Sequence, residues 1–526
     1  MHFGRVEVGR NTLNSQSRRR FLSNVGSGML MAGIGSSMAM ELGISTAYAD
    51  DAETALTFGS LEPLVDLMQQ TPVEKLQPAL MQEIERGTEL KTLIAAGALA
   101  NSRFFAGQDY VGFHTMMALM PAWQISEELS GPGQALPVLK VLYRNTGRIQ
   151  EAGGDEKLHK IKPATLSSTR HGGAQLMKEM CSLNMQSAES TFAALLKKDR
   201  MQAYNSLQQI VQDAPDVHRV TLSWRAWDAL NLVGFEHANT LLRQSVRYCV
   251  EREKGRIEHK QPEPPLRSLT PRLLDEYQLL GKKLGNRKMD ADWVEQFART
   301  LFAGTREQGA EAAAAALAEG IAPEEIGEAM SLAANMLVLH DPGRPEKWAS
   351  EGKPKGSVHG ASEGVHASDA ANAWRNIARV TNHRNQVCSL IVGGWHTAGQ
   401  MGRITDQPFA FDVDPIASGK PGPYDLLDTL KAAVESKDQA KAMAVVKYWE
   451  TIGHRPKAIF DSLRKYAVSQ DGALHAEKYF RTVTEEFATT RKELRWRHLI
   501  GLARVSTSEY GWPAPGGEQA RDLLGA

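Results

Sequence analysis

The sequence is poor in cysteine, and it lacks the short motifs that mark common metal and cofactor sites. Its three cysteines are too few for a disulfide framework, and their odd number leaves at least one thiol free. No Cys-x-x-Cys pair occurs, which excludes zinc ribbons, thioredoxin-like redox pairs and covalent c-type haem. Phosphate-loop and His-Glu-x-x-His patterns are also absent.

An excess of charge of either sign is also missing. The chain has 61 basic and 61 acidic residues among 526, and this balance argues against nucleic acid or an anionic membrane surface as the main partner. Beyond the N-terminal region, no apolar run approaches the length of a membrane span. The composition is that of a globular protein long enough for two or three domains.

The N-terminus carries the pattern of an export signal. A twin arginine followed by Phe-Leu lies in Ser17–Leu22, an apolar stretch follows over 25–44, and Ala47-Tyr48-Ala49 is a small-x-small cleavage site. We therefore expect residues 1–49 to be a signal peptide read by the twin-arginine export machinery, which carries folded and commonly cofactor-loaded proteins. The protein would then be periplasmic or secreted, with no stable membrane span after cleavage. An uncleaved anchor, or export of a passenger without cofactor, are the alternatives.

The rest of the chain is typical of helix. Ala, Leu, Met, Glu, Lys and Gln dominate, apolar residues recur at spacings of three and four, and the alternation typical of strands is scarce. The segments 78–83, 89–102, 174–198, 311–319, 324–339 and 423–449 are expected helices. A proline-rich stretch over 260–266 is a candidate linker.

The parts of the chain on either side of this linker resemble each other. Three pairs of short matches occur in the same order: Gly112-Phe113-His114 with Gly364-Val365-His366, His237-Ala238 with His475-Ala476, and Glu276-Tyr277 with Glu509-Tyr510. Arg243 and Arg481 follow the second histidines at the same offset. The pattern predicts an all-α, tandem-duplicated multi-helix bundle with pseudo-twofold symmetry, with units over 50–260 and 261–526. The alternative is that such short matches arise by chance.

Histidine carries the candidate chemistry, because it is the commonest metal ligand and titrates near neutral pH. Packing about a pseudo-twofold axis would bring His114 to His366 and His237 to His475 in a helical core, where they could bind iron, copper, zinc or a non-covalent haem. His114, His366, Glu276 and Glu509 are the candidate catalytic residues, and Arg243 and Arg481 the candidate cofactor-binding residues. The alternatives are core histidines satisfied by hydrogen bonds and arginines that anchor salt bridges.

One family resemblance follows from these residues. The stretch Val365–Arg375, with the segment around His114 and the two His-Ala helices, resembles the helical pattern of questin oxidase-like proteins. The resemblance implies an all-helical oxidoreductase acting on a small aromatic or polyketide-like substrate. Fungal members use NADPH, for which an exported protein has no ready supply.

The leading hypothesis is therefore an exported helical oxidoreductase with a metal or haem bound by paired histidines. The rival hypothesis is a non-enzymatic helical repeat protein that binds a ligand or partner in the cell envelope, since stacked helices form concave binding surfaces. In that case the paired histidines are packing residues.

Overall fold

The computed structural model describes residues 55–154, 158–166, 171–351, 354–358, 362–400 and 402–525. Every regular element in these ranges is a helix, and pairing between extended segments is limited to isolated bridges. The all-α expectation is confirmed. The predicted signal peptide lies outside the described residues. Among the described helices, none has the length and apolar character that a membrane span requires.

The chain divides into two compact units of very different size. The first comprises Met1–Thr57 and Leu158–Lys160, and its described part contains an antiparallel bridge between Ala55 and His159. The second comprises Phe58–Lys157 and Ile161–Ala526, and it holds all the helices discussed below. Both predicted repeats fall within this second unit, and their common ancestry stays a prediction.

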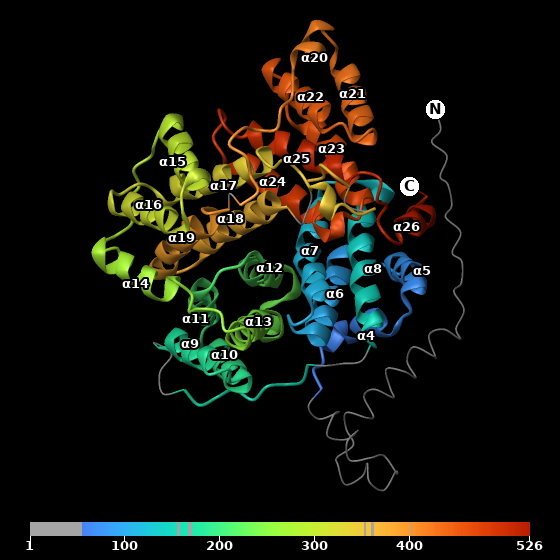
Figure 1. Ribbon diagram of the computed structural model, residues 1–526. Helices are drawn as coiled ribbons and strands as arrows, with labels where there is room; N and C mark the ends of the chain where they lie inside the picture. Colours follow the sequence, from blue (N-terminus) through green and yellow to red (C-terminus); the bar gives the residue numbers. More distant parts are fainter. Residues whose placement is uncertain are drawn as a thin grey trace, which may run out of the picture. The chain divides into compact units, whose positions relative to one another are not determined.

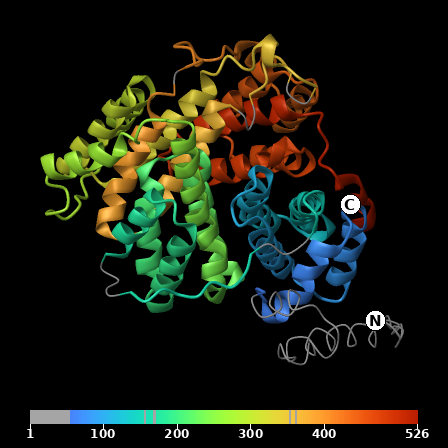
Figure 2. The same cartoon turned by 60° about the horizontal axis from the view of Figure 1, so that its bottom comes forward.

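The first helices of the larger unit form a group around α6 and α8. Helix α6 packs on α4, α7 and α8, and the C-terminal helix α26 lies against α5 and α8 (Figures 1 and 2). The last helix of the chain therefore packs against the first helices of this unit. The bounds are α4 Glu62–Gln70, α5 Val73–Glu85, α6 Leu90–Phe105, α7 Tyr110–Glu127, α8 Leu136–Glu151 and α26 Gly517–Leu524.

Two further groups of helices follow in the chain. They contact each other where α12 packs on α18 and where α11 packs on α19 (Figure 1). The first has α9 Gly172–Cys181, α10 Met185–Lys198, α11 Arg200–Asp213, α12 Val217–Val233 and α13 Ala238–Glu258. The second has α14 Leu266–Glu276, α15 Ala291–Ala303, α16 Arg306–Ala318, α17 Pro323–Leu339, α18 Glu363–Val380 and α19 His383–Thr397. Short 3-10 turns include η3 Phe235–His237 and η5 Gly472–Leu474.

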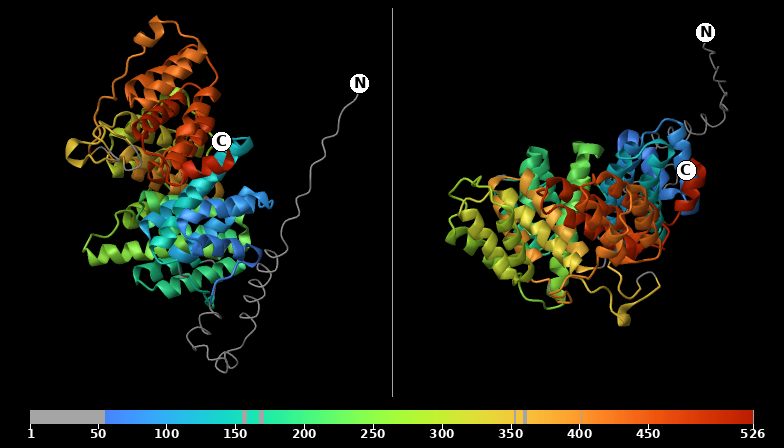
Figure 3. Two further views of the ribbon diagram at one scale, coloured as in Figure 1. Left: turned by 90° about the vertical axis from the view of Figure 1, so that its right-hand side faces the viewer. Right: turned by 90° about the horizontal axis from the view of Figure 1, so that it is seen from above.

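The last group is built around α25, on which α22 and α24 pack (Figure 3). A continuous apolar core joins its helices, with Trp449, Phe480 and Leu499 among the buried members. The bounds are α20 Asp414–Ser418, α21 Pro423–Glu435, α22 Gln439–Thr451, α23 Lys457–Ser469, α24 Ala476–Thr489 and α25 Trp496–Glu509.

Two predicted helices are each divided into two. The segment 174–198 breaks between α9 and α10 at Leu183, and the segment 423–449 breaks between α21 and α22 at Lys437. Both residues have a positive φ, 58° and 60° respectively, which belongs to the left-handed region and ends a helix. Neither residue is a glycine, so composition gave no signal of the break.

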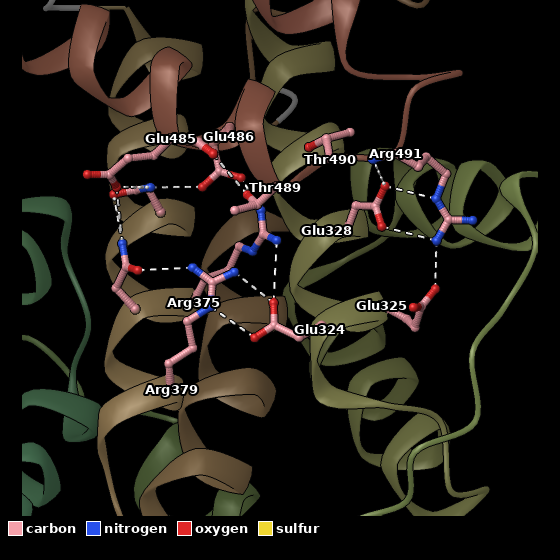
Figure 4. Close-up of polar contacts among 12 residues, drawn as sticks. Glu324, Glu325, Glu328, Arg375, Arg379, Glu485, Glu486, Thr489, Thr490 and Arg491 are labelled. Carbon is pink, nitrogen blue, oxygen red and sulfur yellow. Dashed lines mark hydrogen bonds and ion pairs between the residues drawn. The ribbon is translucent and has the colours of Figure 1, made fainter. Parts of the chain in front are cut away.

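Close helix packing depends on a glycine in the first turn of α18. A Cβ atom on Gly364 would lie 2.4 Å from the backbone nitrogen of Val338 in α17, so only glycine lets these backbones approach. At the other end of α18, side chains tie three helices together (Figure 4). Arg379 binds Glu324 of α17, and Arg375 of α18 forms a buried ion pair with Glu486 of α24. Helix α18 is thus fixed along its whole length.

Candidate functional site

Four histidine rings meet inside the larger unit. The centroid of the His114 ring lies 4.8 Å from that of His218 and 5.2 Å from that of His475. The centroid of the His366 ring lies 5.7 Å from that of His218 and 5.2 Å from that of His475. These contacts form a closed cycle, which we call the four-histidine cluster.

Each member comes from the beginning of a different helix. His114 lies in the first turns of α7, His218 and His366 lie in the first turns of α12 and α18, and His475 immediately precedes α24. The helices contact one another in the same order, α7 with α12, α12 with α18, α18 with α24 and α24 with α7. The cluster therefore follows from the convergence of four helix N-termini.

The sequence fixes where three of these helices start. Asp109, Asp216 and Ser362 precede α7, α12 and α18, and the side chain of each accepts a backbone N–H of the first turn. Such caps satisfy amide groups that a helix leaves unpaired at its beginning. Each cap also fixes the residue at which its helix begins, and so the place of the histidine within the first turns.

Hydrogen bonds assign the tautomers of two rings. Nδ1 of His114 donates to the carbonyl of Tyr110 at 2.6 Å, and Nδ1 of His475 donates to the carbonyl of Ala473 at 2.9 Å. Because a carbonyl only accepts, Nε2 of each ring carries the lone pair. Nε2 of His366 lies 3.2 Å from Nε2 of His475 and is therefore the donor of that pair.

Two of the Nε2 atoms are buried without a partner. These belong to His114 and His218. Nδ1 of His218 lies 3.6 Å from the Oδ1 carboxylate oxygen of Asp216, a partner that orients the ring. Buried polar atoms are normally satisfied, so these two nitrogens leave lone pairs available to a water molecule, an ion or a ligand.

The electrostatics keep the buried rings neutral. Burial, followed by the positive charge of Lys478 and the neighbouring histidines, lowers the pKa of His114 to about 2. The same causes, burial first, hold the pKa of His475 well below its usual value. Burial raises the pKa of Asp216, but the hydrogen bond from His218 and the charge of Arg219 outweigh it, and the net pKa is lowered. Neutral imidazoles with an adjacent carboxylate are typical of metal ligands.

The cluster lies one side chain below the surface. The ring of Tyr110, which is 59% exposed, lies 4.4 Å from the His114 ring and 5.3 Å from the His218 ring, centroid to centroid. On another side, Asp216 lines a cavity of about 490 Å³ together with Trp395 and the proline-rich stretch Pro262–Pro265. This stretch, predicted as a linker, thus forms part of a cavity wall.

Three of the predicted metal ligands, His114, His366 and His475, come together. The fourth, His237, does not: its ring contacts Phe58 edge-on, with centroids 5.6 Å apart, and it is half-buried. His237 precedes α13 as His475 precedes α24, but α13 does not begin at the cluster. The pairing of His237 with His475 is therefore wrong, and His218 of α12 takes that place.

The predicted cofactor-binding arginines are engaged in salt bridges. Arg243 is buried 3.3 Å from a carboxylate oxygen of Glu189, and burial lowers its pKa to about 10. Arg481 pairs with Glu485 within α24 at 2.8 Å. These contacts agree with the alternative that both arginines anchor the bundle rather than hold a cofactor.

The two predicted glutamates have different surroundings. Glu276 ends α14 at the surface and pairs with Arg272 at 2.6 Å, which argues against a catalytic role. Glu509 ends α25, is 7% exposed, and its charge acts on Lys478 beside the cluster.

The sequence analysis missed His218 and Lys478. His218 has no matching histidine in the second predicted repeat, so the pairing of histidines gives no signal for it. The pattern Asp216-x-His218 was the available signal, since an aspartate that caps a helix lies close to a histidine in the first turn. Lys478 lies one turn after His475 on α24.

A haem does not fit between these rings, because two axial imidazoles of one haem have centres more than about 6 Å apart, on opposite faces. A single ion fits better. Four nitrogen ligands about 2.1 Å from an ion lie roughly 3.4 Å apart in a tetrahedron, close to the 3.2 Å between Nε2 of His366 and Nε2 of His475. As the side chains stand, however, no set of three or more His, Cys, Asp or Glu within the described ranges forms a ready metal site. Binding an ion would require rings to turn toward one point.

Fold and site together define an all-α protein with a four-histidine cluster at converging helix N-termini. No family model, no curated protein and no solved structure matches the chain.

Proposed function

We propose that the protein is an exported oxidoreductase whose four-histidine cluster binds one redox-active transition-metal ion, copper or iron. The observation that carries the proposal is the pair of unpartnered, buried Nε2 atoms of His114 and His218 beside the Nε2 atoms of His366 and His475. Imidazole nitrogen suits copper and iron, and the bound ion would supply one-electron chemistry.

The surroundings of the ligands support this proposal. Carbonyl groups orient His114 and His475, and a carboxylate orients His218, as outer partners of metal-bound histidines commonly do. The half-buried position of His366 gives the cluster an edge toward solvent. The cavity beside Asp216 offers space for a small molecule within one side chain of His218. An aromatic substrate, implied by the resemblance, stays a prediction.

Elemental analysis of the protein purified after export in a native-type host tests metal binding. We expect close to one copper or iron per chain in the wild type and in His237→Gln, and a loss of at least tenfold in His114→Gln. His237 is the control because it also lies near the start of a helix but outside the cluster. Equal metal content in all three proteins, or none in any, would refute the metal site.

A redox titration of the metal-loaded protein tests the oxidoreductase. A reversible one-electron spectral change is expected, and an ion that cannot be reduced or oxidised would contradict the proposal while leaving the metal site intact.

The second candidate is a non-enzymatic binding protein in which the cluster only packs helices. The absence of a ready metal arrangement within the described ranges favours it. In that case His114→Gln would lower stability without changing metal content.

A further inference from the structure

The cavity beside Asp216 has a stiff wall. Its volume of about 490 Å³ falls within the range of small-molecule sites, and residues of α11, α12, α13 and α19 line it together with the stretch Pro262–Pro265. Proline restricts the backbone of this stretch, and Nη1 of Arg256 on α13 donates to the carbonyl of Gln261 at 3.0 Å. The wall is therefore held in place without a ligand.

Part of the cavity lining is apolar. The buried side chains of Trp395 and Leu266 line the cavity together with the prolines of the wall. The guanidinium carbon of Arg306 lies 4.4 Å from the centre of the Trp395 ring, a cation–π contact that holds the indole in place. Apolar surface of this kind favours a ligand with a flat apolar body.

The two buried glutamate and aspartate side chains of the lining already have strong partners. Both carboxylate oxygens of Asp213 accept hydrogen bonds of 2.8 Å from Arg267. Arg256 donates to both carboxylate oxygens of Glu253, at 2.9 and 2.8 Å. These two carboxylates therefore need no cation from a ligand.

The other two acidic side chains of the lining are also accounted for. Asp216 accepts a hydrogen bond of 3.1 Å from the hydroxyl of Tyr248, besides the backbone N–H groups of His218 and Arg219. Glu263 is exposed to solvent at the edge of the proline stretch.

The unused hydrogen-bonding capacity of the lining consists of donors. Nε1 of Trp395 and Nε of Arg219 are buried and have no partner among the described residues. Arg252 is 62% exposed, and its nearest carboxylate oxygen, on Asp216, lies 3.9 Å away, too far for a hydrogen bond. These groups only donate, so the complementary ligand offers acceptor oxygens.

We propose that this cavity binds a small organic carboxylate with a flat apolar body. The carboxylate accepts hydrogen bonds from Arg252, and the apolar body lies against Trp395 and the proline wall. The site follows from the cavity alone and stands whether or not the four-histidine cluster holds a metal. Only its role as the substrate site of the oxidoreductase rests on the proposed function.

Isothermal titration calorimetry with the full-length, chelator-treated protein tests the proposal. The probes are phenylacetate, its amide, phenylethylamine and acetate, which separate the carboxylate from the apolar body. We expect phenylacetate to bind at least tenfold more tightly than each of the other three.

Variants of Arg252 test its role at the cavity. The affinity for phenylacetate should fall at least about fivefold in Arg252→Met and be largely kept in Arg252→Lys, because a charged donor strengthens a hydrogen bond to a carboxylate. Arg299→Met is the matched control, since Arg299 is 59% exposed and lies on α15, outside the cavity.

Equal affinity for phenylacetate and its amide, equal affinity in Arg252→Met and Arg299→Met, or no binding of phenylacetate would each overturn the carboxylate site. Tighter binding of phenylethylamine would also overturn it, because the acidic side chains would then select the ligand. Phenylacetate binding by a protein that takes up no metal would refute the proposed function and leave this site standing. Metal uptake without phenylacetate binding would do the reverse.

Discussion

Removing the charge of Lys140 should destabilise the protein strongly, because its ammonium joins two parts of the chain that are far apart in sequence. The side chain is 2% exposed on α8, and Nζ donates to the carbonyls of Ala467 and Gln470 at 2.9 and 2.6 Å. A third bond, of 2.8 Å, reaches Glu477 of α24, which is 1% exposed. These bonds hold the end of α23 and the start of α24, where His475 lies.

The magnitude follows from what the substitution leaves behind. Lys140→Met keeps the aliphatic stem but leaves the Glu477 carboxylate buried without its counter-charge. Breaking a buried ion pair in this way costs about 3–5 kcal/mol of unfolding free energy. The double variant Lys140→Met/Glu477→Gln removes both charges and should recover much of this loss.

Urea denaturation followed by far-ultraviolet circular dichroism measures these differences. Lys457→Met is the control: Lys457 is 80% exposed, pairs with Asp461 at 2.6 Å, and should cost less than about 1 kcal/mol. A loss below about 1 kcal/mol in Lys140→Met, or a double variant as unstable as the sum of the single ones, would refute the reasoning.

Three further predictions concern the cluster. The free energy of unfolding should fall as the pH drops below about 6.5, by about 1.4 kcal/mol per pH unit for each histidine kept neutral, because the unfolded chain binds protons that buried His114 (pKa about 2) does not bind. Urea midpoints at pH 7, 6 and 5 should depend less steeply on pH in His114→Gln than in the wild type, and an equal pH dependence would show that His114 is not the cause. Gly364→Ala should lower the free energy of unfolding by about 1–3 kcal/mol, because its Cβ atom would push α18 away from the α17 backbone, whereas Gly255→Ala, which has open space in α13, should raise it by about 0.5–1 kcal/mol. Thermal midpoints that shift in the same direction in both variants would count against the close packing at Gly364. Asp216→Ser keeps a helix cap but removes the carboxylate near His218, so the metal affinity measured by equilibrium dialysis should fall about 10–100-fold. An unchanged affinity would show that Asp216 does not orient the His218 ring.

The local character of the chain could be predicted, because helix propensity and apolar spacing act over a few residues. The segments 89–102 and 324–339 lie within α6 and α17 to within a few residues. The breaks at Leu183 and Lys437 could not be predicted from composition, since neither residue favours a positive φ.

Part of the site could be predicted because short sequence matches recur in the two parts of the chain. Matching first-turn positions selected His114 and His366, and the His-Ala pairs selected His475. His237 matched equally well and failed, because a helix start says nothing about what it faces in the fold; it faces Phe58. His218 and Lys478 enter the cluster only through the packing of α12 and α24 against α7 and α18, which is a property of the whole chain.

The proposed function requires that His114, His218, His366 and His475 share one metal ion. An anomalous difference map from a crystal of the metal-loaded protein, collected at the absorption edge of the bound metal, tests it most directly. If the four rings share one ion, the map should show one peak about 2.0–2.2 Å from Nε2 of each ring, with the rings turned toward it. No peak at the cluster of a protein shown to contain metal, or a peak at other ligands, would contradict it.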